Sequence, residues 1–206
     1  MLGRDGVQRM VANEAVEVMN WTHQPAWLSP DDRQIWMDRC VQQINWDQPQ
    51  VRVYGRWHRV PRLTAFLADQ QVAYRYSGAV HRGEGWPDWF RPLLDLVSSR
   101  SSAPFNGCLF NLYRDGQDRM GWHADDEFLF DGLRREARIV SLSLCGTSWR
   151  REDGGGDGSD SIGRNWGVRK FQVRRKGKKN ADDVREILLG HGDLMTMEGL
   201  FQKYYL

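Results

Sequence analysis

Long hydrophobic runs are missing from this sequence of 206 residues, since no stretch approaches the roughly 18 apolar residues that a membrane-spanning helix needs. The first residues, Met-Leu-Gly-Arg-Asp-Gly, lack the apolar core of a signal peptide. A strong charge of one sign is missing too, because a formal net charge of +2 is too small to indicate a nucleic-acid partner by itself. We therefore expect a cytoplasmic protein without a membrane partner, and we expect it to be monomeric.

Cysteine is scarce, and its spacing argues against a disulfide framework. The chain has three cysteines, Cys40, Cys108 and Cys145, an odd number with no Cys-x-x-Cys pair. Two of them lie in strand-like apolar runs, so buried, reduced thiols are expected. A chain of this length is about the size of one domain and can bury roughly 70% of its unfolded surface without disulfide support. We expect a single domain over residues 1–206.

The sequence is organised around residues 111–127, where an apolar strand leads through a glycine turn to His123-Ala-Asp125. In a strand, residues two apart point to the same face, so the imidazole and the carboxylate can converge on one point. One nitrogen and one hard oxygen suit a non-haem Fe(II) centre, which takes a second histidine from elsewhere. A bare His-x-Asp is nevertheless weak evidence for a metal site, because short motifs often occur by chance.

Further motifs surround this pair in a definite order. The stretch contains Asn111-x-Tyr113, then Asp-Gly, then Gly-Trp-His-x-Asp-Asp-Glu, and it follows Pro61-Arg-Leu-Thr-Ala65 and Tyr74-x-Tyr-Ser-Gly78. Together these motifs resemble the AlkB-type Fe(II)/2-oxoglutarate dioxygenases, the family that oxidatively removes alkyl groups from nucleobases. The resemblance covers roughly residues 55 to 206 and is strongest from 105 to 127.

The resemblance implies a role for the residues at the centre of the motif. His123 and Asp125 are expected to bind Fe(II) and so to be the catalytic residues. Asn111 and Tyr113 are expected to hydrogen-bond the carboxylates of the co-substrate 2-oxoglutarate. Without the resemblance, Asn111 and Tyr113 would be interpreted as polar residues on the open face of an ordinary strand.

The resemblance also implies a nucleotide-recognition lid, formed by the segment around Arg62 and by Tyr74–Gly78. A flipped base must be held by stacking, and each base–aromatic stack contributes about 1–3 kcal/mol. A carboxylate can accept a hydrogen bond from an exocyclic amino group of a base. The residues expected to contact the substrate are Arg62, Tyr74, Tyr76, Ser77, Asp126 and Glu127.

We predict an α+β fold, a double-stranded β-helix (jelly-roll) core with N-terminal helices on its outer face. Residues 7–19 suggest a short amphipathic helix or an ordered arm. A helix begins at Ser29-Pro-Asp-Asp, which supplies an N-cap and two acids for the helix dipole, and runs to about Ile44. Another helix starts at Trp86-Pro-Asp-Trp89, and Ser101-Ser-Ala-Pro104 ends it.

The rest of the chain should be largely strand. Apolar or alternating runs predict strands at 105–113 and 137–144, and a strand, a tight turn and a second strand at 185–197. The glycine-rich stretch 152–167 predicts a flexible loop. The expected organisation is a helical extension over 1–50, the lid with a scaffold helix over 51–100, and an incomplete jelly-roll core over 105–206.

Positive charge is concentrated in two segments. Residues 51–65 alternate apolar with basic or polar residues, and their arginines form either a solvated face or part of the lid. Residues 164–179 carry eight Lys and Arg and no acid. A solvated hairpin would explain this block, but next to a nucleic-acid site we favour contacts with phosphates.

The family pattern breaks at the C-terminal end. Met197-Glu-Gly-Leu-Phe-Gln202 matches a segment that the family's distal metal histidine follows shortly, and two arginines come further on, but the chain stops at Leu206. His191, between two glycines at a turn, is a weak alternative for the third ligand. A shortened reading frame, an artificially shortened chain or a paralogue that has lost its metal would each explain the break.

The expected function is oxidative dealkylation of N-alkylated bases in DNA, or in RNA, with Fe(II), O₂ and 2-oxoglutarate. Two alternatives stay open. A non-catalytic, nucleic-acid-binding remnant would use the basic block and the tyrosines without iron. A dioxygenase that acts on protein or lipid is the other alternative, against which the tyrosine lid and the basic block argue.

Overall fold

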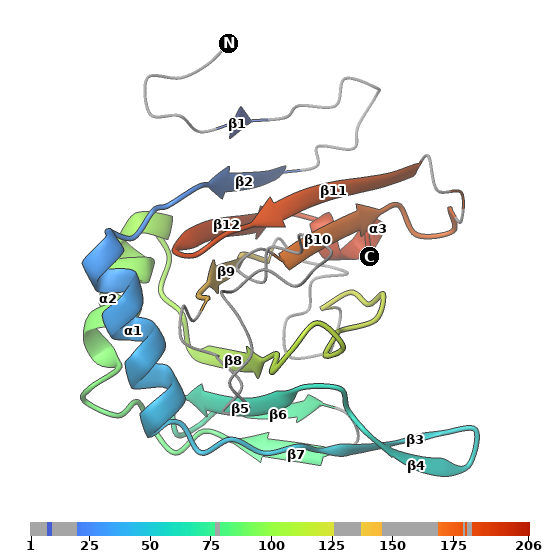
Figure 1. Ribbon diagram of the computed structural model, residues 1–206, viewed down its shortest axis with the longest axis horizontal. Coiled ribbons are helices and arrows are strands. Elements are labelled where there is room, and N and C mark those ends of the chain that lie inside the picture. Colours follow the sequence, from blue (N-terminus) through green and yellow to red (C-terminus); the bar gives the residue numbers. More distant parts are fainter. Residues whose placement is uncertain are drawn as a thin grey trace, which may run out of the picture. The chain divides into compact units, whose positions relative to one another are not determined.

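The computed structural model (Figure 1) contains two compact units, one formed by two separate segments of the chain and the other by a single continuous segment. The terminal unit comprises Met1–Gln43 and Trp122–Leu206, and the middle unit comprises Ile44–Gly121. The residues that the structure describes are 8–9, 20–76, 79–125, 137–145, 169–178, 180 and 183–206. Within these residues, no helix is both long and apolar enough to span a membrane.

The first helix, α1, covers Pro30–Gln43 and begins where the sequence predicts it. The Ser29 hydroxyl accepts a hydrogen bond from the Asp32 N–H at 3.1 Å and donates to the Asp32 carboxylate at 2.7 Å. This reciprocal cap satisfies a backbone donor that the first turn leaves open. The helix buries Trp36, Met37 and Cys40. Burial raises the pKa of the Cys40 thiol to about 11. All three cysteines are free, as predicted, but Cys108 and Cys145 are only partly buried.

The larger sheet of the terminal unit has the order β1-β2-β12-β9, with antiparallel neighbours throughout. Gln8 and Arg9 form a strand, where the sequence suggested a short helix or an ordered arm, and the rest of 7–19 lies outside the described residues. The sequence did not predict β2, and β9 confirms the strand predicted at 137–144. The four strands are β1 (Gln8–Arg9), β2 (Asn20–Gln24), β9 (Ile139–Ser143) and β12 (Asp193–Glu198).

The second sheet of this unit pairs β10 (Arg169–Arg174) with β11 (Val184–Leu189) in antiparallel register. Strands β11 and β12 flank the predicted turn, but each pairs with other strands, so the turn leads the chain from one sheet into the other. The short helix α3 (Phe201–Tyr204) follows β12. One hydrophobic core takes residues from both sheets and from α3: Trp21, Val173, Leu189, Met195, Met197 and Phe201.

The middle unit is built from three antiparallel strand pairs and one helix, α2 (Arg91–Ser101). The helix begins later than predicted, because Phe90 N–H bonds back to the Pro87 carbonyl in a preceding turn. It ends as predicted, at Ser102 in a left-handed conformation with φ 50°. The paired strands are β3 (Gln50–Val53) with β4 (Arg56–Arg59), β5 (Leu63–Ala68) with β8 (Gly107–Leu112), and β6 (Ala73–Tyr76) with β7 (Ala79–Arg82).

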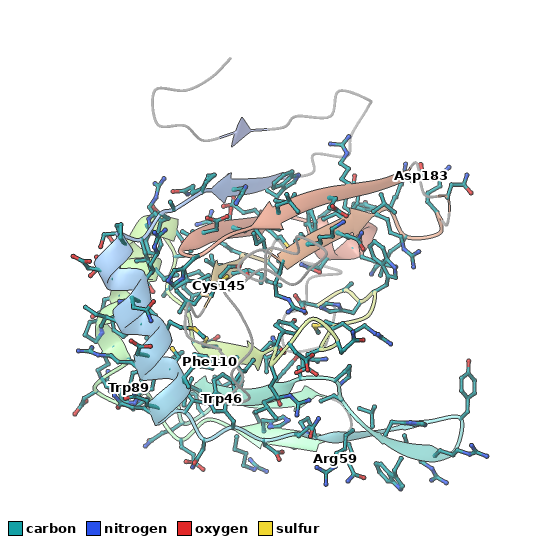
Figure 2. All side chains as sticks on the ribbon, viewed as in Figure 1. Trp46, Arg59, Trp89, Phe110, Cys145 and Asp183 are labelled. Carbon is teal, nitrogen blue, oxygen red and sulfur yellow. The ribbon has the colours of Figure 1, made fainter. Side chains whose placement is uncertain are left out.

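Aromatic rings fill the core of the middle unit. Phe90 stacks on Trp86 with ring centroids 5.6 Å apart, and it meets Phe110 edge-on at 5.3 Å. Trp46 packs on the same Phe110 at 6.4 Å, and Figure 2 shows these two side chains next to each other. Because Phe110 lies on β8, this cluster fixes the strand that carries Asn111.

Candidate active site

His123 and Asp125 approach each other in the terminal unit, as the sequence predicts. The imidazole Nε2 and the carboxylate Oδ1 are 3.6 Å apart, and the side chains are 43% and 26% exposed. The reason for this convergence differs from the predicted one, because residues 122–125 form an irregular segment rather than a strand. Because both side chains are partly exposed, an ion can reach them. Because the segment is not a strand, contacts other than strand pairing must hold it in place.

Two contacts within the terminal unit anchor residues 122–125. The Asp125 N–H donates to the side-chain oxygen of Gln202 at 2.9 Å, and Gln202 lies on α3. At the other end, the Arg174 guanidinium lies 4.2 Å from the centre of the Trp122 ring. A cation over an indole face is an attractive contact, so β10 holds one end of the segment and α3 holds the other.

The donor set of this pair fits a metal such as Fe(II). An imidazole nitrogen and a carboxylate oxygen are two of the three ligands in a facial triad. Over the described ranges, no group of three His, Cys, Asp or Glu residues could hold a metal ion. The structure therefore brings together two groups of the kind that such a centre uses, and the part of the chain that it describes offers no third group beside them.

His191 has a structural role in the turn between β11 and β12. Its Nδ1 accepts a hydrogen bond from the Cys145 N–H at 3.0 Å, and its Nε2 is buried. Burial, together with the nearby Arg33 charge, lowers the pKa of His191 and favours the neutral ring. With one nitrogen engaged by the backbone, His191 gains no support as the third ligand.

The predicted co-substrate residues lie in the middle unit, around the end of β8. Asn111 faces Thr64 across the β5–β8 ladder, and Tyr113 follows the strand. The buried Arg62 donates from Nε to the Asn111 side-chain oxygen at 2.7 Å. The structure thus brings a residue predicted to contact the base into direct contact with a residue predicted to bind 2-oxoglutarate.

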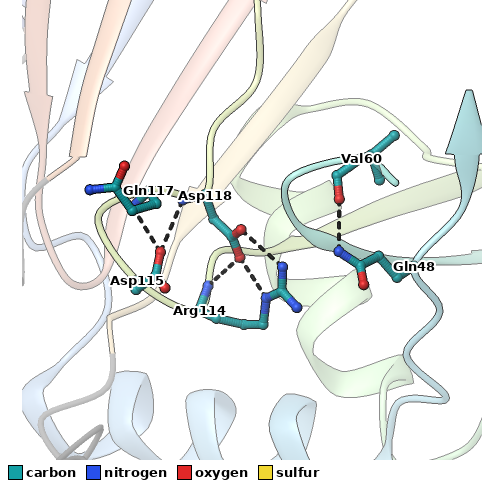
Figure 3. A network of polar contacts seen from close by, with 6 residues as sticks. All are labelled: Gln48, Val60, Arg114, Asp115, Gln117 and Asp118. Atoms are coloured by element: carbon teal, nitrogen blue, oxygen red, sulfur yellow. Dashed lines mark hydrogen bonds and ion pairs between the residues drawn. The ribbon is translucent and has the colours of Figure 1, made fainter. Parts of the chain in front are cut away.

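The turn after β8 is fixed by two carboxylates (Figure 3). Asp118 is buried and accepts hydrogen bonds from the Arg114 N–H at 2.9 Å and from the Arg114 Nε at 2.7 Å and Nη2 at 3.0 Å. The Asp115 carboxylate accepts from the N–H groups of Gln117 and Asp118. The bond to Asp118 raises the pKa of Arg114. A turn with this many charge-assisted bonds holds one conformation.

The other predicted substrate residues are only partly described. Tyr74 is buried on β6, with its ring 5.3 Å from that of Phe66. Tyr76 is the last residue of β6. The remaining residues, Ser77, Asp126 and Glu127, lie outside the described residues. Contact of these five side chains, and of Arg62, with a base stays a prediction.

The hairpin β3–β4 carries an exposed aromatic and cationic surface that the sequence analysis treated only as a run of arginines. Tyr54 at its tip is fully exposed, Trp57 is 65% exposed, and residues 56–59 are exposed throughout. Tyr54 and Gly55 have φ values of 48° and 81°. Positive φ at both central residues defines a type I′ turn. In the sequence, Gly55 between two alternating runs was the feature that could have indicated this turn. Figure 2 labels Arg59 on this hairpin.

Comparison with known proteins gives consistent matches. Residues 20–205 match the family model described as the 2OG-Fe(II) oxygenase superfamily. The chain is 40% identical over 147 residues to the DNA oxidative demethylase ALKBH2 of Bos taurus, over 71% of this chain and 46% of that protein. It is 28% identical over 173 residues to the human alpha-ketoglutarate-dependent dioxygenase alkB homolog 3, over 81% of this chain and 51% of that protein. The chain spans about half the length of these curated relatives.

Proposed function

Because this chain belongs to the 2OG-Fe(II) oxygenase superfamily, we propose that it is an AlkB-type dioxygenase that oxidatively dealkylates N-alkylated bases in DNA, or in RNA. The observation that carries this proposal is the convergence of the His123 imidazole and the Asp125 carboxylate at 3.6 Å. Relatives named DNA oxidative demethylase ALKBH2 support DNA as the substrate.

The proposed division of labour follows from the side chains. His123 and Asp125 would hold the iron, and Asn111 and Tyr113 would hydrogen-bond the carboxylates of 2-oxoglutarate. When bound, Fe(II) and 2-oxoglutarate would supply the oxidation by O₂ of the alkyl carbon. The oxidised carbon then leaves the base as an aldehyde. The protein has to hold these groups in fixed positions, and the bond from Arg62 to Asn111 does so for one amide.

We also infer that the terminal unit is a double-stranded β-helix, the jelly-roll form. Its two antiparallel sheets share one hydrophobic core, and the turn before β12 leads the chain from one sheet into the other. Strands that alternate between two facing sheets are typical of jelly rolls.

The nucleic-acid partner is supported by the hairpin β3–β4. Exposed aromatic rings can stack on bases of any sequence, and neighbouring arginines attract the phosphate backbone. Tyr54 and Trp57 supply the rings, and the exposed Arg56 and Arg59 flank Trp57. This combination is the chemistry of a surface that binds single strands.

The activity can be tested on an oligonucleotide that carries one 1-methyladenine. Incubated with Fe(II), 2-oxoglutarate and O₂, the chain is expected to remove the methyl group, and formaldehyde and succinate should appear in equal amounts. Mass spectrometry of the oligonucleotide measures the loss of the methyl group, and chromatography measures the succinate. Binding of the oligonucleotide with no turnover would contradict the proposed activity and favour the non-catalytic remnant.

The exposed cations after β10 are expected to contact phosphates. Substituting glutamine for Arg175 and Lys178, which are both exposed, should weaken binding of all oligonucleotides. It should also lower the slope of log K against log salt by about 2, roughly one for each lost phosphate contact. Fluorescence anisotropy over a salt series measures both quantities.

A matched control is available on α2. Glutamine at the exposed Arg91 and Arg100 removes the same charge from the middle unit, and this variant should keep the wild-type slope. Equal slopes for wild type and the Arg175/Lys178 variant would show that the basic block is a solvated hairpin. Arg174 is left unchanged because it stacks on Trp122.

A further inference from the structure

The segment that carries His123 and Asp125 forms no strand in the described part of the chain, and a distant side chain holds its backbone at Asp125. The Asp125 N–H, which strand pairing does not satisfy, donates to the Gln202 side chain at 2.9 Å. Gln202 is 77 residues away in sequence. A long-range bond from a side chain thus replaces the ladder bonds that would fix an ordinary strand.

The Gln202 side chain is itself rigid. It is 5% exposed, and its Nε2 donates to the Met197 sulfur at 3.5 Å. Only the amide oxygen can accept a hydrogen bond from an N–H group, so the contact with Asp125 also sets the orientation of the amide. Its neighbour Phe201 belongs to the hydrophobic core, which fixes the start of α3.

We propose that Gln202 is a positioning residue for the metal ligand Asp125, holding its backbone so that the carboxylate stays beside the His123 imidazole before the metal binds. The inference rests on the proposed function, because it assumes that His123 and Asp125 bind iron. A ligand pair that is already in place loses less conformational freedom on binding. Partners that orient ligands commonly change metal affinity 10- to 100-fold.

The experiment compares three variants of the whole chain. Gln202→Met keeps the length of the side chain and removes the acceptor, and Gln202→Glu keeps an acceptor at the same reach. Gln172→Met makes the same exchange at an exposed glutamine on β10, which bonds to Glu186. Hydrogen exchange of the Asp125 amide, followed by NMR without metal, reports the bond itself. Anaerobic titration of Fe(II) with 2-oxoglutarate, followed by the charge-transfer band, reports metal affinity.

For Gln202→Met, we expect the Asp125 amide to lose its protection and the Fe(II) affinity to fall by about 10-fold or more. Gln202→Glu is expected to retain both, and Gln172→Met to behave as wild type. If near-ultraviolet circular dichroism shows that Gln202→Met does not fold, Gln202→Asn retracts the same amide by one methylene and is expected to give the same two losses.

Unchanged Fe(II) affinity in a folded variant whose Asp125 amide has lost protection would overturn the positioning role, because the bond would then be only structural. Failure of the proposed function looks different. In that case His123→Ala would bind Fe(II) as well as wild type does, which would remove the metal pair and the role of Gln202 with it.

Discussion

Substituting alanine for His123 or Asp125 is expected to weaken Fe(II) binding by more than about 100-fold, because even partners that only orient ligands are worth 10- to 100-fold. The two groups lie 3.6 Å apart. Each supplies a donor that the other cannot replace, since one is an imidazole nitrogen and the other a carboxylate oxygen. The charge-transfer band of an anaerobic titration with 2-oxoglutarate measures the loss.

Matched controls exist in the middle unit. His58 and Asp88 are exposed, so His58→Ala and Asp88→Ala remove the same groups without touching the pair. Both controls should bind iron as wild type does. If His123→Ala and Asp125→Ala keep the band, the metal site lies elsewhere in the chain, and the proposed mechanism would lose its basis.

Replacing Asp193 with alanine is expected to cost about 3 kcal/mol of unfolding free energy, the scale for removing one partner from a buried charged network. The buried carboxylate accepts hydrogen bonds at 2.8 Å from the Ala26 N–H, the Gly190 N–H and the His23 Nε2. It thereby ties the end of β2 to the turn before β12. For a chain of this size, the melting temperature should fall by roughly 6–12 °C.

The pH dependence of this contribution has a definite sign. Burial opposes ionisation of Asp193, but the bonds from Ala26, Gly190 and His23 outweigh it and hold the pKa of the carboxyl below its ordinary value. A group whose folded pKa is lowered stabilises the fold above its unfolded pKa, about 3.9. The stabilisation is lost as the pH falls through the lower folded value. Wild type and Asp193→Ala should therefore differ most near neutral pH and converge under strongly acidic conditions.

Thermal denaturation followed by circular dichroism measures both effects. Asp88→Ala, at an exposed carboxylate, should leave the melting temperature within a degree or so of wild type, as surface substitutions usually do. A similar small shift for Asp193→Ala would show that the three donors find other partners and that the carboxylate is not needed to join β2 to the turn.

Local signals in the sequence predicted several elements well. The Ser29 cap marks the start of α1 because the cap is made by residues three apart. Strands β8, β9, β11 and β12 carry alternating or continuous apolar runs, which patterning detects. By contrast, β2 reads Asn-Trp-Thr-His-Gln and is held by its neighbours in the sheet rather than by its own hydrophobicity.

The sequence predicted that His123 and Asp125 lie close together, but it did not predict the contacts that hold them. His123 and Asp125 stand in one short motif, so the sequence brings them together. Gln202 reaches Asp125 from 77 residues away, and Asp193 reaches Ala26 from 167 residues away. No local pattern encodes such pairs, because they depend on which strands the sheets bring side by side. The same limit explains why the hydrogen bond from Arg62 to Asn111 could not be predicted from the sequence.

The hairpin β3–β4 is expected to be only weakly stable by itself. Among the described strands, β3 and β4 pair only with each other, and a two-stranded ribbon is marginally stable in water. At its tip, Tyr54 has a positive φ, which residues other than glycine rarely adopt. Local opening of this ribbon is therefore expected to cost little, and a partner that covers the rings would supply part of the free energy that orders it.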